Sequence, residues 1–392
     1  MHAITLRYAS SARAHGCAHA AGAFGLSLAL CACAFAQGTT YSTIERGRYL
    51  VDARDCASCH TAEGGQPFAG GKAIATPFGT IYSTNITPDA STGIGKWSDQ
   101  DLFKAMHDGI RRDGKHLYPA FPYPWFTRTS RDDVRAIRAF LNTLAPVRQQ
   151  NKPSALPWPL DIREVMAGWN TLYFHEGFYK PNPDKSGQWN RGAYLVEGLG
   201  HCGACHTGTN VLGGTKTDEK LRGGDFGEHW YAPTLTGNLR EGLGAWSLED
   251  IVTYLKTGSN SRSSAAGPMA EVVKNSTQHL SEGDLYSIAV YLKDVPADQA
   301  RADTKASAVD TQALSHGEAV FVDNCTGCHM ENGAGIPQIF PTLKGSSIVQ
   351  SKNPDTVIHV VVAGAKTPGT SGKPTRFAMP AFDSKLRRLR TT

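Results

Sequence analysis

Apolar residues recur at the spacing of one helix face in three matching stretches of the chain. Residues 45–51 read Glu-Arg-Gly-Arg-Tyr-Leu-Val, residues 190–196 read Asn-Arg-Gly-Ala-Tyr-Leu-Val, and residues 315–321 read Ser-His-Gly-Glu-Ala-Val-Phe. In each stretch a glycine is followed by apolar residues that share one side of a helix. An internal repeat of this kind predicts three similar units, each beginning with one of these helices.

A helix-capping pattern marks later helices in the first two units. A serine that caps a helix accepts a hydrogen bond from the backbone three residues on, where an acidic side chain bonds back to the cap. The pattern Ser-x-x-Asp occurs at residues 98–101, 130–133, 247–250 and 281–284. We therefore expect a middle helix in each unit, ending near Gly109 and Gly258, and a closing helix that runs through Leu141 and Leu292.

The third unit departs from this plan at its end. Asn353 and Pro354 suit the start of its middle helix, because proline is favoured at the first helical position. After Phe382 the sequence reaches Thr392 without a closing helix, and a basic tail stands in that place (Lys385, Arg387, Arg388 and Arg390). Two explanations of this ending are open: a short solvated end, and a truncated or frame-shifted sequence. We favour a truncated or frame-shifted sequence, because the closing helix should pack against the first helix.

These patterns predict an all-α protein of three tandem units over residues 40–146, 188–296 and 309–392. Its 392 residues suffice for about two to four domains. Residues 147–187 are rich in proline and aromatics, too apolar for a flexible spacer. They either pack between two units and fix their spacing, or form a docking surface for a partner or the membrane interface. Residues 297–308 are polar and charged and predict a linker.

The amino-terminal segment has the features of a secretory signal. Arg7 and Arg13 precede an uncharged, small and apolar run over residues 20–36, which ends in Ala-Phe-Ala before Gln37. We therefore predict a signal peptide over residues 1–36 and export of the mature chain. The run is too short for a membrane span, and a faint lipobox at residues 30–33 leaves lipidation as an alternative.

Each unit also carries the motif C-x-x-C-H, at residues 56–60, 202–206 and 325–329. This is the attachment signature of a c-type haem: two thiols bind the two vinyl groups of one porphyrin, and the histidine ligates the iron. One such motif alone could hold a disulfide or half a zinc site, but three identical spacings argue against that. The predicted cofactors are three covalently bound haem c groups. Their attachment residues are Cys56, Cys59, Cys202, Cys205, Cys325 and Cys328, with His60, His206 and His329 as iron ligands.

The cysteine count agrees with this interpretation. Three of the nine cysteines, Cys17, Cys31 and Cys33, precede the predicted cleavage site, and the other six all lie in the motifs. No thiol is left for a disulfide, although an oxidising compartment would permit one. The formal net charge is +5 without a basic stripe, so nucleic-acid binding has no support.

An electron-transfer cytochrome c usually has a sixth iron ligand, most often a methionine that raises the reduction potential. Met269 follows Pro268 in the second unit, and Met379 precedes Pro380 in the third. Proline stiffens the loop that presents each sulfur. We therefore predict both methionines as distal ligands, with packing in the core as the alternative.

The first unit lacks this methionine. Two tryptophans expected to pack against the porphyrin, Trp97 and Trp246, serve as reference points: Met269 lies 23 residues after Trp246, and Phe121 lies 24 residues after Trp97, one residue from the matching position. Phenylalanine cannot ligate iron. Three states remain open, in this order: an open or water-bound iron, ligation by His116, and ligation by Met106. His107, beside Met106 on the predicted middle helix, is a further nearby imidazole.

The mature chain resembles the cytochrome c subunit of membrane-bound bacterial dehydrogenases, which include quinoprotein alcohol dehydrogenase and the flavoprotein gluconate, sorbitol and fructose dehydrogenases. The motif alone would not separate this family from other multihaem cytochromes, but its flanks do. The stretches that carry the resemblance are residues 112–120 (Arg-Asp-Gly-Lys-His-Leu-Tyr-Pro-Ala), 156–159, 166–170 and 267–271.

The resemblance implies a partner and a location. A flavoprotein, quinoprotein or molybdenum subunit would oxidise an alcohol, sugar or aldehyde on the periplasmic side of the cytoplasmic membrane. Its electrons would pass through this subunit to ubiquinone or to a terminal oxidase. Two departures from the family are Phe121, where members usually have methionine, and the missing closing helix.

No acid, base or nucleophile set of the usual catalytic kinds is recognisable. The sequence therefore favours an electron-transfer subunit without a substrate site of its own, and leaves open whether the chain is itself an enzyme. The alternatives are a peroxidase-like multihaem enzyme and a gas-binding protein, both using the open iron of the first unit.

Overall fold

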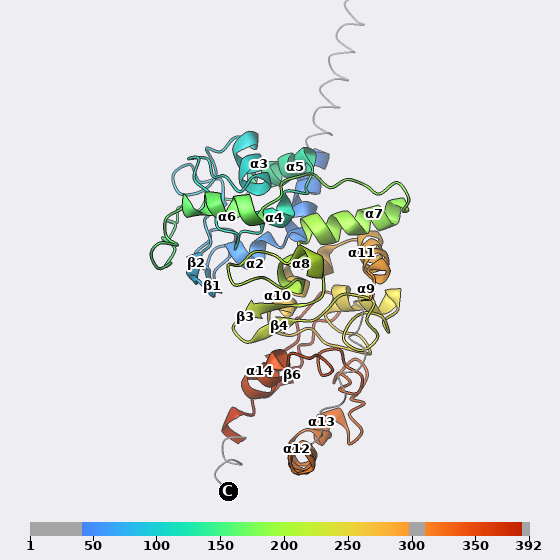
Figure 1. Ribbon diagram of the computed structural model, residues 1–392. Helices are drawn as coiled ribbons and strands as arrows, with labels where there is room; N and C mark the ends of the chain where they lie inside the picture. The colour runs from blue at the N-terminus through green and yellow to red at the C-terminus, as the bar shows by residue number, and fades with distance from the viewer. Residues whose placement is uncertain (1–40, 298–309, 386–392) are drawn as a thin grey trace, which may run out of the picture.

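The computed structural model describes residues 41–297 and 310–385 (Figure 1). The predicted signal peptide, the linker at 297–308 apart from its first residue, and most of the basic tail lie outside these residues. We call residues 41–146 region 1, residues 147–186 the connecting segment, residues 187–297 region 2, and residues 310–385 region 3.

The described chain is mostly helical, as the sequence predicts. Region 1 contains a first helix over residues 41–53, α2 (Cys56–His60), β1 (Ala73–Thr76), β2 (Gly79–Tyr82), α3 (Asp99–His107), α4 (Tyr123–Phe126) and α5 (Arg131–Leu141). The connecting segment contains α6 (Val165–Tyr173). Region 2 contains α7 (Gly187–Tyr194), η1 (Leu195–Leu199), α8 (Gly203–His206), η2 (Thr217–Glu219), β3 (Gly224–Gly227), β4 (Trp230–Ala232), α9 (Leu248–Thr257), α10 (Gly267–Asn275), η3 (Thr277–His279) and α11 (Glu282–Asp294). Region 3 contains α12 (Thr311–Asn324), α13 (Thr326–His329), α14 (Asp355–Ala363), β5 (Ala365–Lys366) and β6 (Ala378–Met379).

Each region also has one short antiparallel pair of strands, which the sequence analysis did not predict. The pairs are β1 with β2, β3 with β4, and β5 with β6. In β1 and β2 the register sets Ala73 opposite Tyr82. These strands are two to four residues long and follow a C-x-x-C-H motif or a middle helix, so they add turns to a helical framework.

The predicted caps are confirmed. The side chain of Ser98 accepts from the backbone of Asp101, and that carboxylate bonds back to Ser98, which completes a capping box at the start of α3. Ser247 and Asp250 do the same for α9. The C-terminal cap of α9 is Gly258, whose φ of 79° is the left-handed conformation that glycine adopts without strain.

In regions 1 and 2 the first helix crosses the closing helix at the repeated glycine. A Cβ atom on Gly47 would lie 1.9 Å from the carbonyl oxygen of Ala136 in α5. A Cβ atom on Gly192 would lie 1.9 Å from the carbonyl oxygen of Ser287 in α11. Glycine thus recurs in the repeat because only a residue without a side chain lets two helix backbones come so close.

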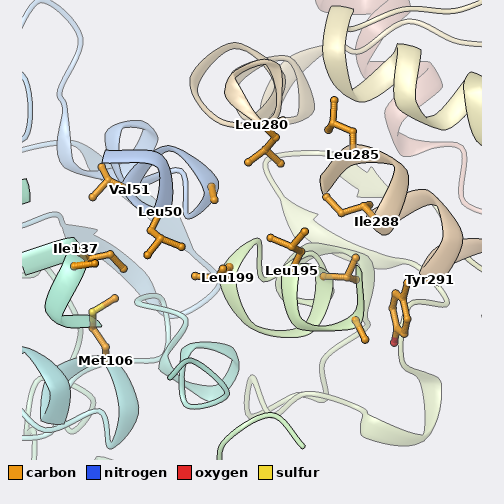
Figure 2. Close-up of a cluster of buried hydrophobic side chains, with 14 of the residues drawn as sticks. Leu50, Val51, Met106, Ile137, Leu195, Leu199, Leu280, Leu285, Ile288 and Tyr291 are labelled. Carbon is orange, nitrogen blue, oxygen red and sulfur yellow. The ribbon is translucent and has the colours of Figure 1, made fainter. Parts of the chain in front are cut away.

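Regions 1 and 2 share one hydrophobic core. Leu50, Met106 and Ile137 lie on the region 1 side of this cluster, and Leu195 and Leu285 lie on the region 2 side (Figure 2). Leu50 and Leu195 occupy equivalent positions in the repeat, and each is 2 % exposed. The two regions therefore bury equivalent faces against each other.

A reciprocal set of hydrogen bonds joins the same two regions. Within region 1, Arg46 Nε donates to Asp133 at 2.9 Å, and within region 2, Arg191 Nε donates to Asp284 at 2.8 Å. The hydroxyl of Tyr49 crosses over to Asp284 at 2.6 Å, and the hydroxyl of Tyr194 crosses over to Asp133. Each aspartate therefore binds the arginine of its own region and the tyrosine of the other.

Region 3 is packed differently. The helix α12 buries none of its residues, and Leu314 is 62 % exposed. A Cβ atom on Gly317, the counterpart of Gly47, would meet nothing within 4 Å. Residues 310–385 contain no helix that covers this face.

Region 3 contacts region 2 at the strand β4, below which it lies in Figure 1. The hydroxyl of Thr356 donates to the carbonyl of Tyr231 at 2.9 Å and accepts from the amide of Tyr231 at 2.8 Å. The ring of Trp230 lies 4.4 Å from that of His359, measured between centroids. One helix of region 3, α14, therefore makes the contact to β4.

The connecting segment binds both neighbours. Asn170 accepts from the hydroxyl of Tyr123 in region 1 at 2.5 Å, and the indole of Trp169 donates to the carbonyl of Leu212 in region 2 at 2.9 Å. Trp158 is nevertheless 80 % exposed, so an apolar part of the segment faces outward. No helix in the described ranges is both long and apolar enough to cross a membrane.

Candidate haem sites

Each C-x-x-C-H motif forms one turn of helix. Cys56 and His60 begin and end α2, whereas Cys202 and Cys325 are the caps that open α8 and α13. In a helical turn, residues three apart are neighbours on one side, so both thiols of a motif lie on one face. All six motif cysteines are free.

All three motif histidines are held in the same way. The Nδ1 atom of His60 lies 2.7 Å from the carbonyl oxygen of Thr84, that of His206 lies 2.7 Å from that of Pro233, and that of His329 lies 3.1 Å from that of Pro341. A carbonyl can only accept, so Nδ1 carries the proton and Nε2 keeps its lone pair for a metal. Such a second partner is what orients a metal-binding imidazole.

The carbonyl partners were missed at the sequence level. A Pro-Thr pair occurs at residues 233–234 and again at 341–342, downstream of the second and third motifs, and this repeat was a usable signal. In region 1 the matching pair is Thr84 and Asn85, so the repeat alone would have found two of the three partners.

The protonation states suit haem attachment. Burial lowers the pKa of His60 and of His206, which keeps both imidazoles neutral, the form that ligates iron. Burial also raises the pKa of Cys56 to about 12 and of Cys202 to about 11. These thiols stay protonated and without a disulfide partner. The donor set of each motif therefore fits a covalently held haem.

In region 2 a strand pair connects the motif to the predicted distal methionine. The helix α8 packs on β3, and β3 pairs with β4. A Cβ atom on Gly267 would lie 2.3 Å from the ring of Trp230 in β4, so this ring fills the space beside the glycine. Met269 follows two residues later and packs with Tyr254, Ala270 and Val273. The hairpin thus links the helix that ends at His206 to the helix that carries Met269.

In region 3 two phenylalanines make the corresponding connection. Phe340 immediately precedes the carbonyl partner of His329, and Phe377 lies two residues before Met379. Their ring centroids are 6.5 Å apart in an edge-on contact. Met379 itself lies in β6, opposite Ala365. The loops on either side of the predicted haem therefore meet in this region also.

In region 1 an aromatic wall stands where the methionine loop stands in region 2. The ring of Phe121 packs edge-on against Phe126 with 5.3 Å between centroids; Phe126 is buried, and Phe121 packs against the shared core. The hydroxyl of Tyr118 donates to the carbonyl of Leu160 at 2.8 Å, which fixes the start of this loop.

The alternative ligands of region 1 have other contacts. Met106 is 4 % exposed within the shared core. The Nδ1 atom of His116 lies 3.3 Å from the side-chain nitrogen of Asn170. His107 is buried between the rings of Phe103 and Phe178, each 4.7 Å away between centroids, and its Nδ1 lies 2.6 Å from Asp108.

The first two motifs lie against each other, an arrangement that the sequence did not predict. Asn275 donates to Ser58 inside the first motif at 2.7 Å. The ring of Trp125 from region 1 covers Gly203 inside the second motif. This ring occupies the space that a Cβ atom on Gly203 would need. His201 Nε2 lies 3.3 Å from the carbonyl oxygen of Arg54, so the residues before both motifs also touch.

The cytochrome c family matches residues 44–145 and 314–389. The chain is 42 % identical over 383 residues to the cytochrome c subunit of alcohol dehydrogenase (quinone) from Gluconobacter oxydans, covering 93 % of this chain and 80 % of that protein. It is 41 % identical over 363 residues to the gluconate 2-dehydrogenase cytochrome c subunit of Pantoea cypripedii, covering 88 % and 82 %. It is also 44 % identical over 349 residues to one of the subunits of nicotinate dehydrogenase from Pseudomonas putida, a longer protein of which it spans 29 %.

Proposed function

The chain belongs to the family of cytochrome c subunits of bacterial dehydrogenases, and we propose that it carries three covalent haem c groups that conduct electrons out of a catalytic partner. Electron transfer as a dehydrogenase subunit follows from the family, and so does covalently bound haem. The number of haems, their ligands and the acceptor are our proposal.

The observation that carries the count is the threefold recurrence of the imidazole–carbonyl hydrogen bond. Each motif has its own carbonyl partner, at Thr84, Pro233 and Pro341. A hydrogen bond from Nδ1 to a carbonyl orients an imidazole for metal binding, and each of these histidines directly follows the second of two free thiols. Three independent occurrences support three sites.

The residues of each site have distinct tasks. Both thiols fix the porphyrin covalently, and the histidine Nε2 binds the iron while Nδ1 donates to its carbonyl. Met269 and Met379 close the distal side of the second and third sites. The bound haem supplies reversible one-electron exchange between ferric and ferrous iron. The three sites belong to three tandem cytochrome c domains over residues 40–146, 188–296 and 309–392.

The first site has a distal side without a protein ligand. Support comes from Phe121 at the methionine position, from Met106 inside the shared core, and from His116 beside Asn170. Peroxidase-like and gas-binding functions for this iron are not favoured, because the relatives that match this chain over most of its length are subunits of dehydrogenases.

The electron donor is a dehydrogenase catalytic subunit, and its flavin, quinone or molybdenum chemistry is left to the partner. The acceptor is ubiquinone or a terminal oxidase. The mature chain works on the periplasmic side of the cytoplasmic membrane, after removal of residues 1–36. The exposed Trp158 of the connecting segment is one place where a membrane surface or partner can bind.

The count is tested by haem analysis of the exported chain. Intact-protein mass and pyridine haemochrome spectra should give three haems per chain, and the paired substitutions C56A/C59A, C202A/C205A and C325A/C328A should each remove one. A wild-type protein with two haems would overturn the proposal. Magnetic spectra should show one high-spin ferric haem that C56A/C59A removes, and three low-spin haems would contradict the open first site.

A further inference from the structure

A buried guanidinium lies beside the first motif. Arg54 is two residues before Cys56 and is 1 % exposed. Its Nη2 donates to the hydroxyl of Thr129, its Nη1 lies 4.0 Å from the sulfur of Met106, and its Cζ lies 4.1 Å from the ring centroid of Phe126. Its Nε has no partner among the described residues.

None of these contacts neutralises the charge. Within residues 41–297 and 310–385, Arg54 forms no ion pair with a carboxylate. The groups that act electrostatically on Arg54 are Cys56, Tyr194 and Asp133, and the one carboxylate among them, Asp133, is already bound by Arg46 and Tyr194. Burial lowers the pKa of Arg54 to about 10, so the guanidinium is still charged at neutral pH.

The position of the charge ties it to the first haem. Arg54 packs on Phe126, and Phe126 packs on Phe121, the residue at the vacant methionine position. The guanidinium therefore stacks on the aromatic pair that contains Phe121 and also acts electrostatically on the attachment cysteine Cys56.

The other two motifs lack such a cation. Two residues before the second motif stands Gly200, and two residues before the third stands Asp323, whose side chain is exposed. A buried, unpaired charge is costly to fold, and only the first of the three repeats supplies one at this position before its motif, although the backbone of Arg54 also meets His201 before the second motif. This contrast points to a task at the first haem rather than to a common need of the repeat.

We propose that Arg54 raises the reduction potential of the haem attached at Cys56 and Cys59. The inference rests on the proposed haem at that motif. Ferric haem has one more positive charge than ferrous haem, so a nearby cation in a poorly screened interior favours the ferrous state. A methionine ligand would also raise the potential, and Phe121 cannot do so. Arg54 offsets that loss.

The test is a spectroelectrochemical titration of the full-length, haem-loaded chain. Arg54→Met should lower the midpoint of one haem so that its ferrous-to-ferric ratio at fixed potential falls about tenfold, which is about 59 mV for a one-electron couple. Arg54→Lys should keep the midpoint. Thr129→Asp keeps the arginine but gives it a counter-ion, and should lower the same midpoint.

Arg135→Met is the matched control, because Arg135 is an exposed arginine of region 1 paired with Asp132. It should leave all midpoints unchanged, since water screens its charge. Unchanged midpoints in both Arg54→Met and Thr129→Asp at full haem content would refute the role of Arg54. A wild-type chain without haem at Cys56 and Cys59 would instead refute the proposed function, and pyridine haemochrome spectra separate the two results.

Discussion

Regions 1 and 2 form a reciprocal pair, whereas the contacts of region 3 with region 2 are not reciprocal. In the pair, Tyr49 and Tyr194 each reach the aspartate of the other region. The equivalent position in region 3 is Ala319, which has no hydroxyl to donate. Regions 1 and 2, which dock face to face, therefore have a tyrosine at this repeat position. Region 3, which does not dock in this way, has an alanine there.

The contrast extends to the haem sites. In regions 1 and 2, Asn275 donates to Ser58 inside the first motif, and the residues before the two motifs touch through His201 and Arg54. Region 3 meets region 2 where α14 packs on β4 and where Ser371 and Lys373 bind Gln278 and Ser259. Two closely packed regions are thus followed by a third that is joined to them by separate contacts. Four measurements test this contrast.

The largest effect is expected at the helix crossings. Gly47→Ala and Gly192→Ala set a methyl group against a carbonyl oxygen of the closing helix, so each should lower the free energy of unfolding by about 3 kcal/mol. Gly317→Ala faces open space inside a helix and should gain up to about 1 kcal/mol. Denaturant unfolding followed by circular dichroism gives these differences. Equal destabilisation at all three glycines would contradict the contrast between the regions.

The next effect concerns the exchanged tyrosines. Tyr194→Phe leaves the buried Asp133 without one charge-assisted hydrogen bond and should cost about 2 kcal/mol. Tyr49→Phe should act similarly through Asp284. A double-mutant cycle of Tyr194→Phe with Asp133→Asn measures the coupling, and its absence would show that the reciprocal bonds contribute nothing. Ala319→Phe, a change at the same repeat position in region 3, is the control and should leave the pairing of regions 1 and 2 intact.

A third, smaller effect follows from the pKa of Asp284. Burial raises the pKa of Asp284, but the hydrogen bonds from Arg191 and Tyr49 outweigh it and hold the pKa below its usual value. A carboxyl whose pKa is lower in the folded state stabilises the fold above its unfolded pKa of about 4, and this stabilisation is lost as the pH falls further. Unfolding at pH 2 to 6 should show this loss, and Asp284→Asn should flatten it. A profile that the substitution does not change would exclude Asp284 as the source.

The smallest effect belongs to region 3. Thr356→Val removes both hydrogen bonds to Tyr231 and should cost about 1 kcal/mol at the contact alone. Limited proteolysis should then release region 3 sooner, while the unfolding of regions 1 and 2 keeps its midpoint. A shifted midpoint for the pair would mean that the three regions fold as one unit.

The features that local chemistry determines could be predicted from the sequence. Ser98 and Ser247 cap helices because a hydroxyl accepts from an amide three residues on, and both capping boxes are present. The mostly helical content also followed from apolar spacing. The strand pairs were missed because they are only two to four residues long, below the length at which alternation becomes a signal.

The contacts between regions could not be predicted in this way. Tyr49 and Asp284 are far apart in sequence, and each reads locally as an ordinary surface residue of a helix. The burial of Arg54 had no signal either, because an arginine before a motif is usually solvated. The ligand residues themselves remain predictions: the imidazole contacts favour the three histidines, and the positions of Met269 and Met379 are compatible with ligation.

The ring of Trp125 over Gly203 has a consequence for the biogenesis of the molecule. A thioether bond at Cys202 and Cys205 can form only while an attachment enzyme has access to the turn between them. In the folded chain that turn is covered by a side chain from the preceding region. The haem that we propose at the second motif would therefore have to be attached before the first region closes over it, although the first region leaves the ribosome earlier. Under this proposal, the docking of the two regions, rather than the order of synthesis, sets when the second motif can be loaded.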